Sequence, residues 1–146
     1  MKIAGLTAPA LHCMNKMNLN LRPHHLLCTR AFRGKGYSPA FVENMSRVIA
    51  EIKNGACITL TAGLDDICAA CPEKEGSVCK SEEKVQTFDA RVLERFHLER
   101  KTYSYTELEH CITEYLDEAA YEYICCNCEW RQTGVCTYTD VQTVIR

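Results

Sequence analysis

Two stretches of this chain carry the same cysteine pattern, C-x2-C-x7-C. The triplets are Cys68, Cys71 and Cys79 in the first stretch and Cys125, Cys128 and Cys136 in the second. With eleven cysteines in 146 residues, two such triplets arise by chance on the order of once in several hundred chains, an estimate from composition and internal repetition. The repetition therefore indicates two segments that share one task.

The spacing within each triplet favours metal binding. Two thiolates separated by two residues can converge on one ion from a tight turn. A glycine near the third cysteine, Gly76 or Gly134, permits a close return of the chain. A single CxxC also occurs in thiol oxidoreductases, but two copies with the same third member predict a metal centre at each triplet.

Each triplet is one ligand short of four, so we expect further ligands from elsewhere in the chain. Cys28 is the first candidate, because it lies one helical turn after His24 and both side chains then share one face. His25 and Cys126 are the next candidates. Cys111 lies on the apolar stripe of a predicted helix, and we expect it to pack in the core.

The abundance of cysteine is also typical of secreted, disulfide-linked domains. However, an odd number of cysteines cannot pair completely within one chain, and Pro9 and His12 interrupt the only apolar stretch near the start, so no secretory signal is evident. No run of about 18 apolar residues is present for a bilayer span. We therefore expect a cytoplasmic protein without a membrane partner, whose clustered cysteines are metal ligands or redox groups.

The charge balance does not favour nucleic acid as a partner. The net charge is −2, so no general basic field is present. A local group of basic residues, Arg22, Arg30, Arg33 and Lys35, lacks the Walker and dinucleotide-binding patterns. We interpret it as a solvated basic patch.

Hydrophobic periodicity predicts a mainly α fold with a minor β element, a small α+β domain over residues 17–146. Helices are expected after Pro23, after Ser38, after Ser81 and after Ser104, the last with an apolar stripe that runs to Ala119. Residues 57–62 predict a short strand that begins at Cys57, whose partner strand is not evident. The two triplets occupy cysteine-rich loops, at 63–80 and from 124 onward.

Residues 1–16 are expected to be a leader that is either disordered or not native, since a start at Met17 would lead directly into the first convincing element. A short leader that packs on the domain is the alternative.

Several motifs together resemble one family. They are RPHHLLC, FRGKGYSPAFVENM, DDICAACP with a further cysteine, YSY, and CxxCEWRxxGVC. This set, which runs from about Leu21 to Cys136, resembles a bacterial and archaeal family, domain of unknown function 1284, whose members are usually labelled as iron–sulfur binding. The resemblance implies ligand roles for Cys28 and the six triplet cysteines, with His24 and His25 as further candidates.

From these observations we expect an iron–sulfur protein, of the 4Fe–4S kind, that relays electrons or senses oxidation for a redox partner protein and is not itself an enzyme. Zinc is the alternative cofactor, because three cysteines and His24 or His25 make a standard structural zinc set. The alternative functions are a zinc-stabilised module that binds protein or nucleic acid, and an enzyme with an open iron. Trp130 could shield a cluster from water, or act as a packing anchor.

Overall fold

The computed structural model describes residues 13, 17–76 and 78–145. The helices are α2 (His25–Ala31), α3 (Pro39–Lys53), α4 (Glu82–Phe96), α5 (Tyr105–Tyr115), α6 (Glu118–Cys125), α7 (Glu129–Gln132) and α8 (Tyr138–Val141), with a 3-10 helix η1 at Cys68–Ala70. The strands are β1 (Asn18–Leu21), β2 (Cys57–Leu60), β3 (Lys74–Glu75), β4 (Val78–Cys79) and β5 (Thr102–Tyr103). The predicted α+β class is confirmed.

The predicted strand at Cys57 is the centre of a three-stranded sheet. It pairs in parallel with β1, where Leu19 lies opposite Ile58, and antiparallel with β5. Neither partner strand was evident from the sequence. β1 has only four residues and β5 only two, and strands this short show no clear alternating pattern.

Most helix boundaries follow local capping signals. The Ser38 hydroxyl accepts the N–H of Phe41 at the start of α3, and the Ser104 hydroxyl accepts the N–H of Glu107 at the start of α5. Ser81 precedes α4 without a side-chain cap. The single helix expected from Ser104 to Ala119 is wrong, because the chain turns extended at Leu116 and Asp117 caps a new helix, α6.

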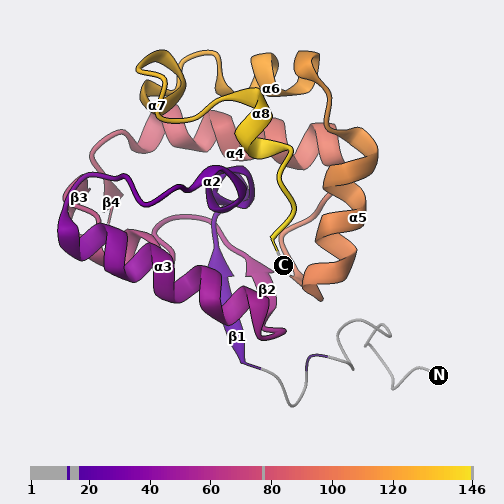
Figure 1. Cartoon of the computed structure of the whole chain (residues 1–146), viewed down its shortest axis with the longest axis horizontal. Coiled ribbons are helices and arrows are strands. Elements are labelled where there is room, and N and C mark those ends of the chain that lie inside the picture. Colours follow the sequence, from indigo (N-terminus) through magenta and orange to yellow (C-terminus); the bar gives the residue numbers. More distant parts are fainter. Residues whose placement is uncertain (1–12, 14–16, 77, 146) are drawn as a thin grey trace.

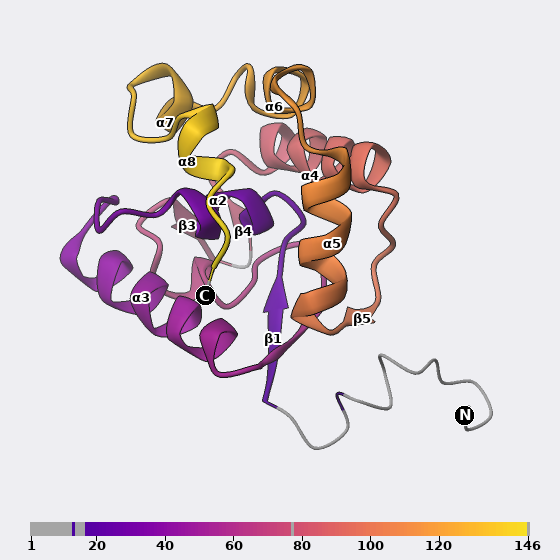
Figure 2. The ribbon, with the colours of Figure 1, turned by 45° about the vertical axis from the view of Figure 1, so that its right-hand side comes forward.

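Helix α2 lies in the middle of the molecule (Figures 1 and 2). Helix α3 lies on one side of α2, and the layer formed by α4, α6, α7 and α8 lies on the other (Figure 1). The first cysteine triplet lies on η1 and the β3–β4 hairpin, and the second spans the end of α6 to the start of α8. Helix α2 is therefore positioned to contribute side chains to both triplets.

The expectation of a solvated basic patch is wrong for two of its four residues, because Arg22 and Arg30 are buried. Arg22 is 1% exposed, its Nε lies 2.8 Å from Asp89, and its two terminal nitrogens donate to Glu82 at 2.8 and 2.9 Å. Arg30 is also buried and donates from Nε to the carbonyl of Val141. The Arg22 guanidinium links the start of α2 to α4, and the Arg30 guanidinium links α2 to α8. Spacing along the chain does not indicate such contacts between distant segments.

The Arg22–Glu82 pair predicts acid sensitivity. Hydrogen bonds from Arg22 lower the pKa of Glu82 from 4.5 to about 2, so the unfolded state binds a proton before the folded state does. The stability contributed by this pair is complete above about pH 4.5 and is lost as the pH falls toward 2. The free energy of unfolding, measured with urea, should fall between pH 6 and pH 3. We expect Glu82→Gln to make this fall smaller by on the order of 1–3 kcal/mol. An unchanged difference between these two pH values would contradict the assignment.

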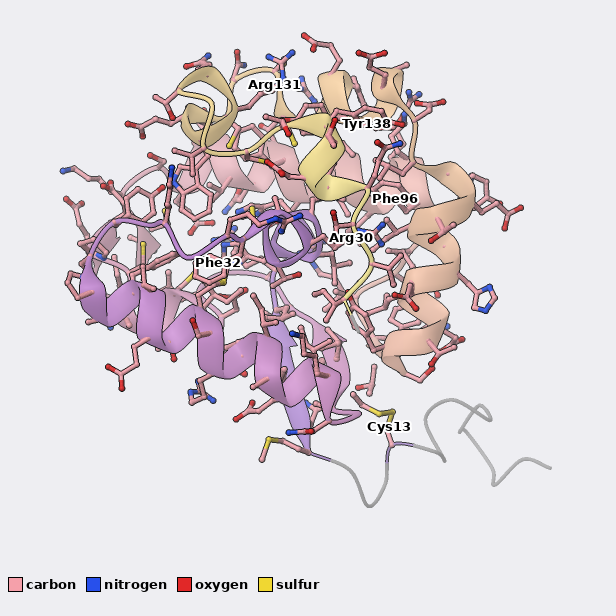
Figure 3. The ribbon with its side chains drawn as sticks, viewed as in Figure 1. Cys13, Arg30, Phe32, Phe96, Arg131 and Tyr138 are labelled. Atoms are coloured by element: carbon pink, nitrogen blue, oxygen red, sulfur yellow. A yellow bond between two sulfur atoms is a disulfide. The ribbon has the colours of Figure 1, made fainter. Side chains whose placement is uncertain are left out.

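Cys57 is buried at the start of β2, as expected, and it forms a disulfide with Cys13 (Figure 3). The sequence did not indicate this bond, since Cys13 belongs to no repeated pattern. The rest of the proposed leader lies outside the described residues. In the part of the chain that the structure describes, every helix is too short or too polar to cross a bilayer.

Candidate metal centre

The two CxxC segments adopt the same local turn. The N–H of Cys71 donates to the carbonyl of Cys68 at 3.0 Å, and the N–H of Cys128 donates to the carbonyl of Cys125 at 2.9 Å. The glycines before the third cysteines, Gly76 and Gly134, both have positive φ, at 61° and 79°. The CxxC part of the repeat therefore corresponds to a repeated turn, whereas the chain between the second and third cysteines forms the β3–β4 hairpin in one triplet and α7 in the other.

Helix α2 places Cys28 beside the second triplet. Burial raises the pKa of the Cys28 thiol well above its usual value, and negative charge on Cys128, Cys136 and Cys125 raises it further. Burial also raises the pKa of Cys125, again with Cys128 and Cys136 as its next contributors. Each pair of these four sulfurs is therefore close enough to interact electrostatically. We call Cys28, Cys125, Cys128 and Cys136 the four-cysteine group.

Four neighbouring thiols, one buried and three partly buried, fit a metal cofactor. Burial makes the thiolates of Cys28, Cys125 and Cys136 costly to form, and a bound cation removes this cost by neutralising the negative charge. The Tyr121 hydroxyl supports one of the four, because it donates to the carbonyl of Cys136 at 3.1 Å and lies 3.8 Å from the Cys136 sulfur. The donor set therefore suits soft-metal or iron–sulfur ligation.

The first triplet faces the same interior space as Cys28. A cavity of about 120 Å³ is lined by cysteines from both triplets and by two histidines: Cys28, Cys68, Cys71, Cys79, Cys128, His24 and His25. Cys125 and Cys136 are not in its lining. Burial raises the pKa of Cys71, and the charge of Cys79 adds to this effect. The structure thus brings Cys28, both histidines and cysteines of both triplets to one cavity beside α2.

Both histidines are held by buried carboxylates. Nδ1 of His24 lies 2.6 Å from Asp89, and Nδ1 of His25 lies 2.6 Å from Asp65. Burial lowers the pKa of His24, while hydrogen bonds and nearby histidines keep both aspartates ionised by lowering their pKa values against the effect of burial. Each carboxylate therefore accepts a hydrogen bond from Nδ1–H, and Nε2 is the ring nitrogen that is left to bind a metal. This is how metal-binding histidines are usually held.

Asp65 and Asp89 hold the two candidate histidine ligands, and the sequence analysis identified neither of them. Asp65 precedes Cys68 in the DDICAAC segment, whose acidic pair was not recognised as a signal. Asp89 lies on α4 in register with buried Val92 and Phe96, and a carboxylate on an apolar stripe needs a buried partner. That anomaly was visible in the sequence, but its partners, Arg22 and His24, were not.

Three aromatic side chains line the cavity between α3 and α7. The ring centres of Tyr37 and Phe41 are 5.2 Å apart, and Trp130 lies 5.5 Å from Tyr37 and 5.8 Å from Phe41. Trp130 and Phe41 thus line the cavity beside Cys28, Cys71 and Cys128, while Tyr37 is 42% exposed. The arrangement is compatible with both roles considered for Trp130, as a shield and as a packing anchor.

The two remaining candidates lie away from the cavity lining. Cys111 packs against the hydrophobic core from α5, as expected. Cys126, considered as an outside ligand, lies 3.7 Å from a guanidinium nitrogen of Arg91 and does not line the cavity. Among the outside candidates, the structure therefore places Cys28 and the two histidines at the site.

The family described as "Protein of unknown function (DUF1284)" matches residues 36–134, more than half of the chain. The matched range contains five of the triplet cysteines, whereas Cys28, both histidines and Cys136 lie outside it. No curated protein and no solved structure gives a significant match. The chain belongs to the DUF1284 family, as its motifs suggested.

Proposed function

We propose that this protein binds an iron–sulfur cluster through the four-cysteine group and uses it to relay electrons, or to sense oxidation, for a partner protein. The observation that carries the proposal is the position of Cys28, which lines the same cavity as Cys128 and interacts electrostatically with all three cysteines of the second triplet. Four cysteine thiolates are the standard ligand set of such clusters.

The composition of the group favours a cluster over a single zinc ion. Iron–sulfur clusters are held by cysteine thiolates, and a cubane takes four of them, one at each iron atom. The four-cysteine group offers this number without a histidine, whereas His25 lies beside the first triplet at Cys68.

The surroundings of the group suit one-electron chemistry. When bound, the cluster would supply the redox centre, and its potential would depend on burial and on hydrogen bonds near the sulfurs. Tyr121 provides a hydroxyl beside Cys136, and Trp130 covers the neighbouring cavity. Asn127 and Glu129, which flank Cys128, are exposed. A partner that docks on this segment would come close to the centre.

The alternative of an enzyme with an open iron requires a cluster that is held by only three cysteines. It loses support at this group, because Cys28 would be the fourth ligand and would occupy the open position on that iron. Zinc remains an alternative for the first triplet, because His24 and His25 line the same cavity as Cys68, Cys71 and Cys79. A nucleic-acid partner gains no support, since two of the four basic residues near α2 are buried.

Protein purified without oxygen tests the proposal directly. We expect brown protein with broad absorption near about 400 nm, bleaching on addition of dithionite, and iron and acid-labile sulfide in equal amounts. Fully folded protein that is colourless and contains neither iron nor sulfide would refute the proposal. Protein exposed to air is unsuitable for the test, since oxidation of the cysteines destroys their ligand function.

A further inference from the structure

We propose that the first triplet forms a separate centre, in which His25 joins Cys68, Cys71 and Cys79 to bind one zinc ion. The inference rests on the proposed function in one respect, since it leaves Cys28 to the four-cysteine group. It differs from the proposed function in both cofactor and ligand set. The second centre would be structural, without a redox role.

The geometry around Cys68 points to this ligand set. The Cys68 sulfur, a ring nitrogen of His25 and a carboxylate oxygen of Asp65 all lie within 4.8 Å of one another, and no other group of three potential ligands is this compact in the part of the chain that the structure describes. Ligands of a tetrahedral zinc ion lie slightly closer together than this. A small adjustment would therefore allow His25 and Cys68 to share an ion.

Asp65 orients the ligands and is not a ligand itself. Its Oδ1 accepts the N–H groups of Ile67 and Cys68 at 3.0 and 2.9 Å. Its Oδ2 accepts the N–H of Arg22 and the Nδ1–H of His25, both at 2.6 Å. Four hydrogen bonds occupy the lone pairs of the carboxylate. One buried side chain thus holds both the backbone of Cys68 and the ring of His25, and it leaves Nε2 of His25 for the metal.

The β3–β4 hairpin returns the third cysteine toward the first two. Lys74 pairs with Cys79 across the hairpin, and the N–H of Lys74 donates to the carbonyl of Cys71 at 3.1 Å. The N–H of Ser81 donates to the Cys79 sulfur at 3.4 Å, a contact that stabilises a thiolate ligand. Cys79 is therefore held beside Cys71, with its sulfur already accepting a hydrogen bond.

The segment that carries Cys71 and Cys79 also needs an internal link. Of its described residues from 69 to 80, none is buried, and each strand of the hairpin has two residues. A hairpin this short is not stable alone in water, and of the three cysteines of the first triplet, Cys68, Cys71 and Cys79, only Cys68 is buried. A structural zinc ion with three sulfurs and one nitrogen would supply the missing stability.

The neighbouring histidine provides a matched control. His24 also has a carboxylate on Nδ1 and also lines the cavity, but it is in no compact group with a cysteine. If the inference is correct, His25→Ala removes a zinc ligand and His24→Ala does not. The two variants change the same chemical group in adjacent residues.

The test uses the intact protein, purified without oxygen. We expect one zinc per chain beside the iron, and zinc-edge X-ray absorption that reports three sulfur ligands and one nitrogen. We expect His25→Ala to weaken zinc binding on the order of 100-fold in competition with a chromophoric chelator, with iron content and visible absorption unchanged. His24→Ala should leave the zinc affinity and the zinc spectrum unchanged.

Zinc binding that survives in His25→Ala with its nitrogen ligand intact would overturn the inference, and so would iron at the first triplet. If His25→Ala does not fold, Cys71→Ser replaces it, with loss of one sulfur ligand as the expected result and an unchanged zinc spectrum as the refutation. Failure of the proposed function is distinguishable, because it removes iron and sulfide whether or not zinc is present.

Discussion

Replacing Cys28 with serine is expected to abolish the visible absorption of the protein and to reduce its iron and sulfide from stoichiometric amounts to about a tenth or less. In the proposed centre Cys28 supplies the fourth thiol beside Cys125, Cys128 and Cys136, and a serine hydroxyl is a poor ligand for a soft iron–sulfur centre. The measurement is iron and sulfide content after anaerobic purification. Circular dichroism of the same sample checks that the helices remain.

Cys111→Ser is the matched control for this experiment. Cys111 is also a partly buried helical cysteine, but it packs against the core from α5 and lies outside the cavity. We expect this variant to keep its colour, iron and sulfide. A Cys28→Ser protein that keeps a full cluster would show that Cys28 is only a packing residue, and the open-iron enzyme would then regain support.

Arg22→Met is expected to destabilise the protein by about 3–5 kcal/mol, because it removes one partner of a buried charge network and leaves the other uncompensated. Asp89 is fully buried and lies 2.8 Å from Arg22, and Glu82 accepts both terminal nitrogens of the same guanidinium. In a chain of this size the loss corresponds to a melting midpoint lower by about 10 °C. The measurement is thermal unfolding of the cofactor-loaded protein without oxygen.

Arg47→Met separates this effect from the general loss of an arginine. Arg47 also pairs with a glutamate, Glu51, at 2.7 Å, but its side chain is 51% exposed. A pair of this kind contributes about 0.5 kcal/mol, so the melting midpoint should move by about 2 °C or less. Equal shifts in the two variants would contradict a structural role for the buried network.

The local features of the fold could be predicted from sequence because their signals are local. The serine caps of α3 and α5, the apolar stripe of α3 and the strand at Cys57 depend on residues within one or two turns of each other. The sheet as a whole could not be predicted. Its outer strands are stable only when paired with a segment that lies some forty residues away in the chain.

The candidate site divides in the same way. The doubled C-x2-C-x7-C pattern, by itself, predicted two short segments with matching CxxC turns and six candidate cysteine ligands. The helical spacing of His24 and Cys28 added these two residues, with His25 as a further candidate. Only the tertiary structure decided that Cys28 lies with Cys125, Cys128 and Cys136, that His25 lies with Cys68, and that buried aspartates hold both histidines. The physical reason is that spacing along the chain determines local turns. Which triplet Cys28 or His25 lies beside depends instead on how α2 packs between α3 and the layer of α4, α6, α7 and α8 (Figure 1).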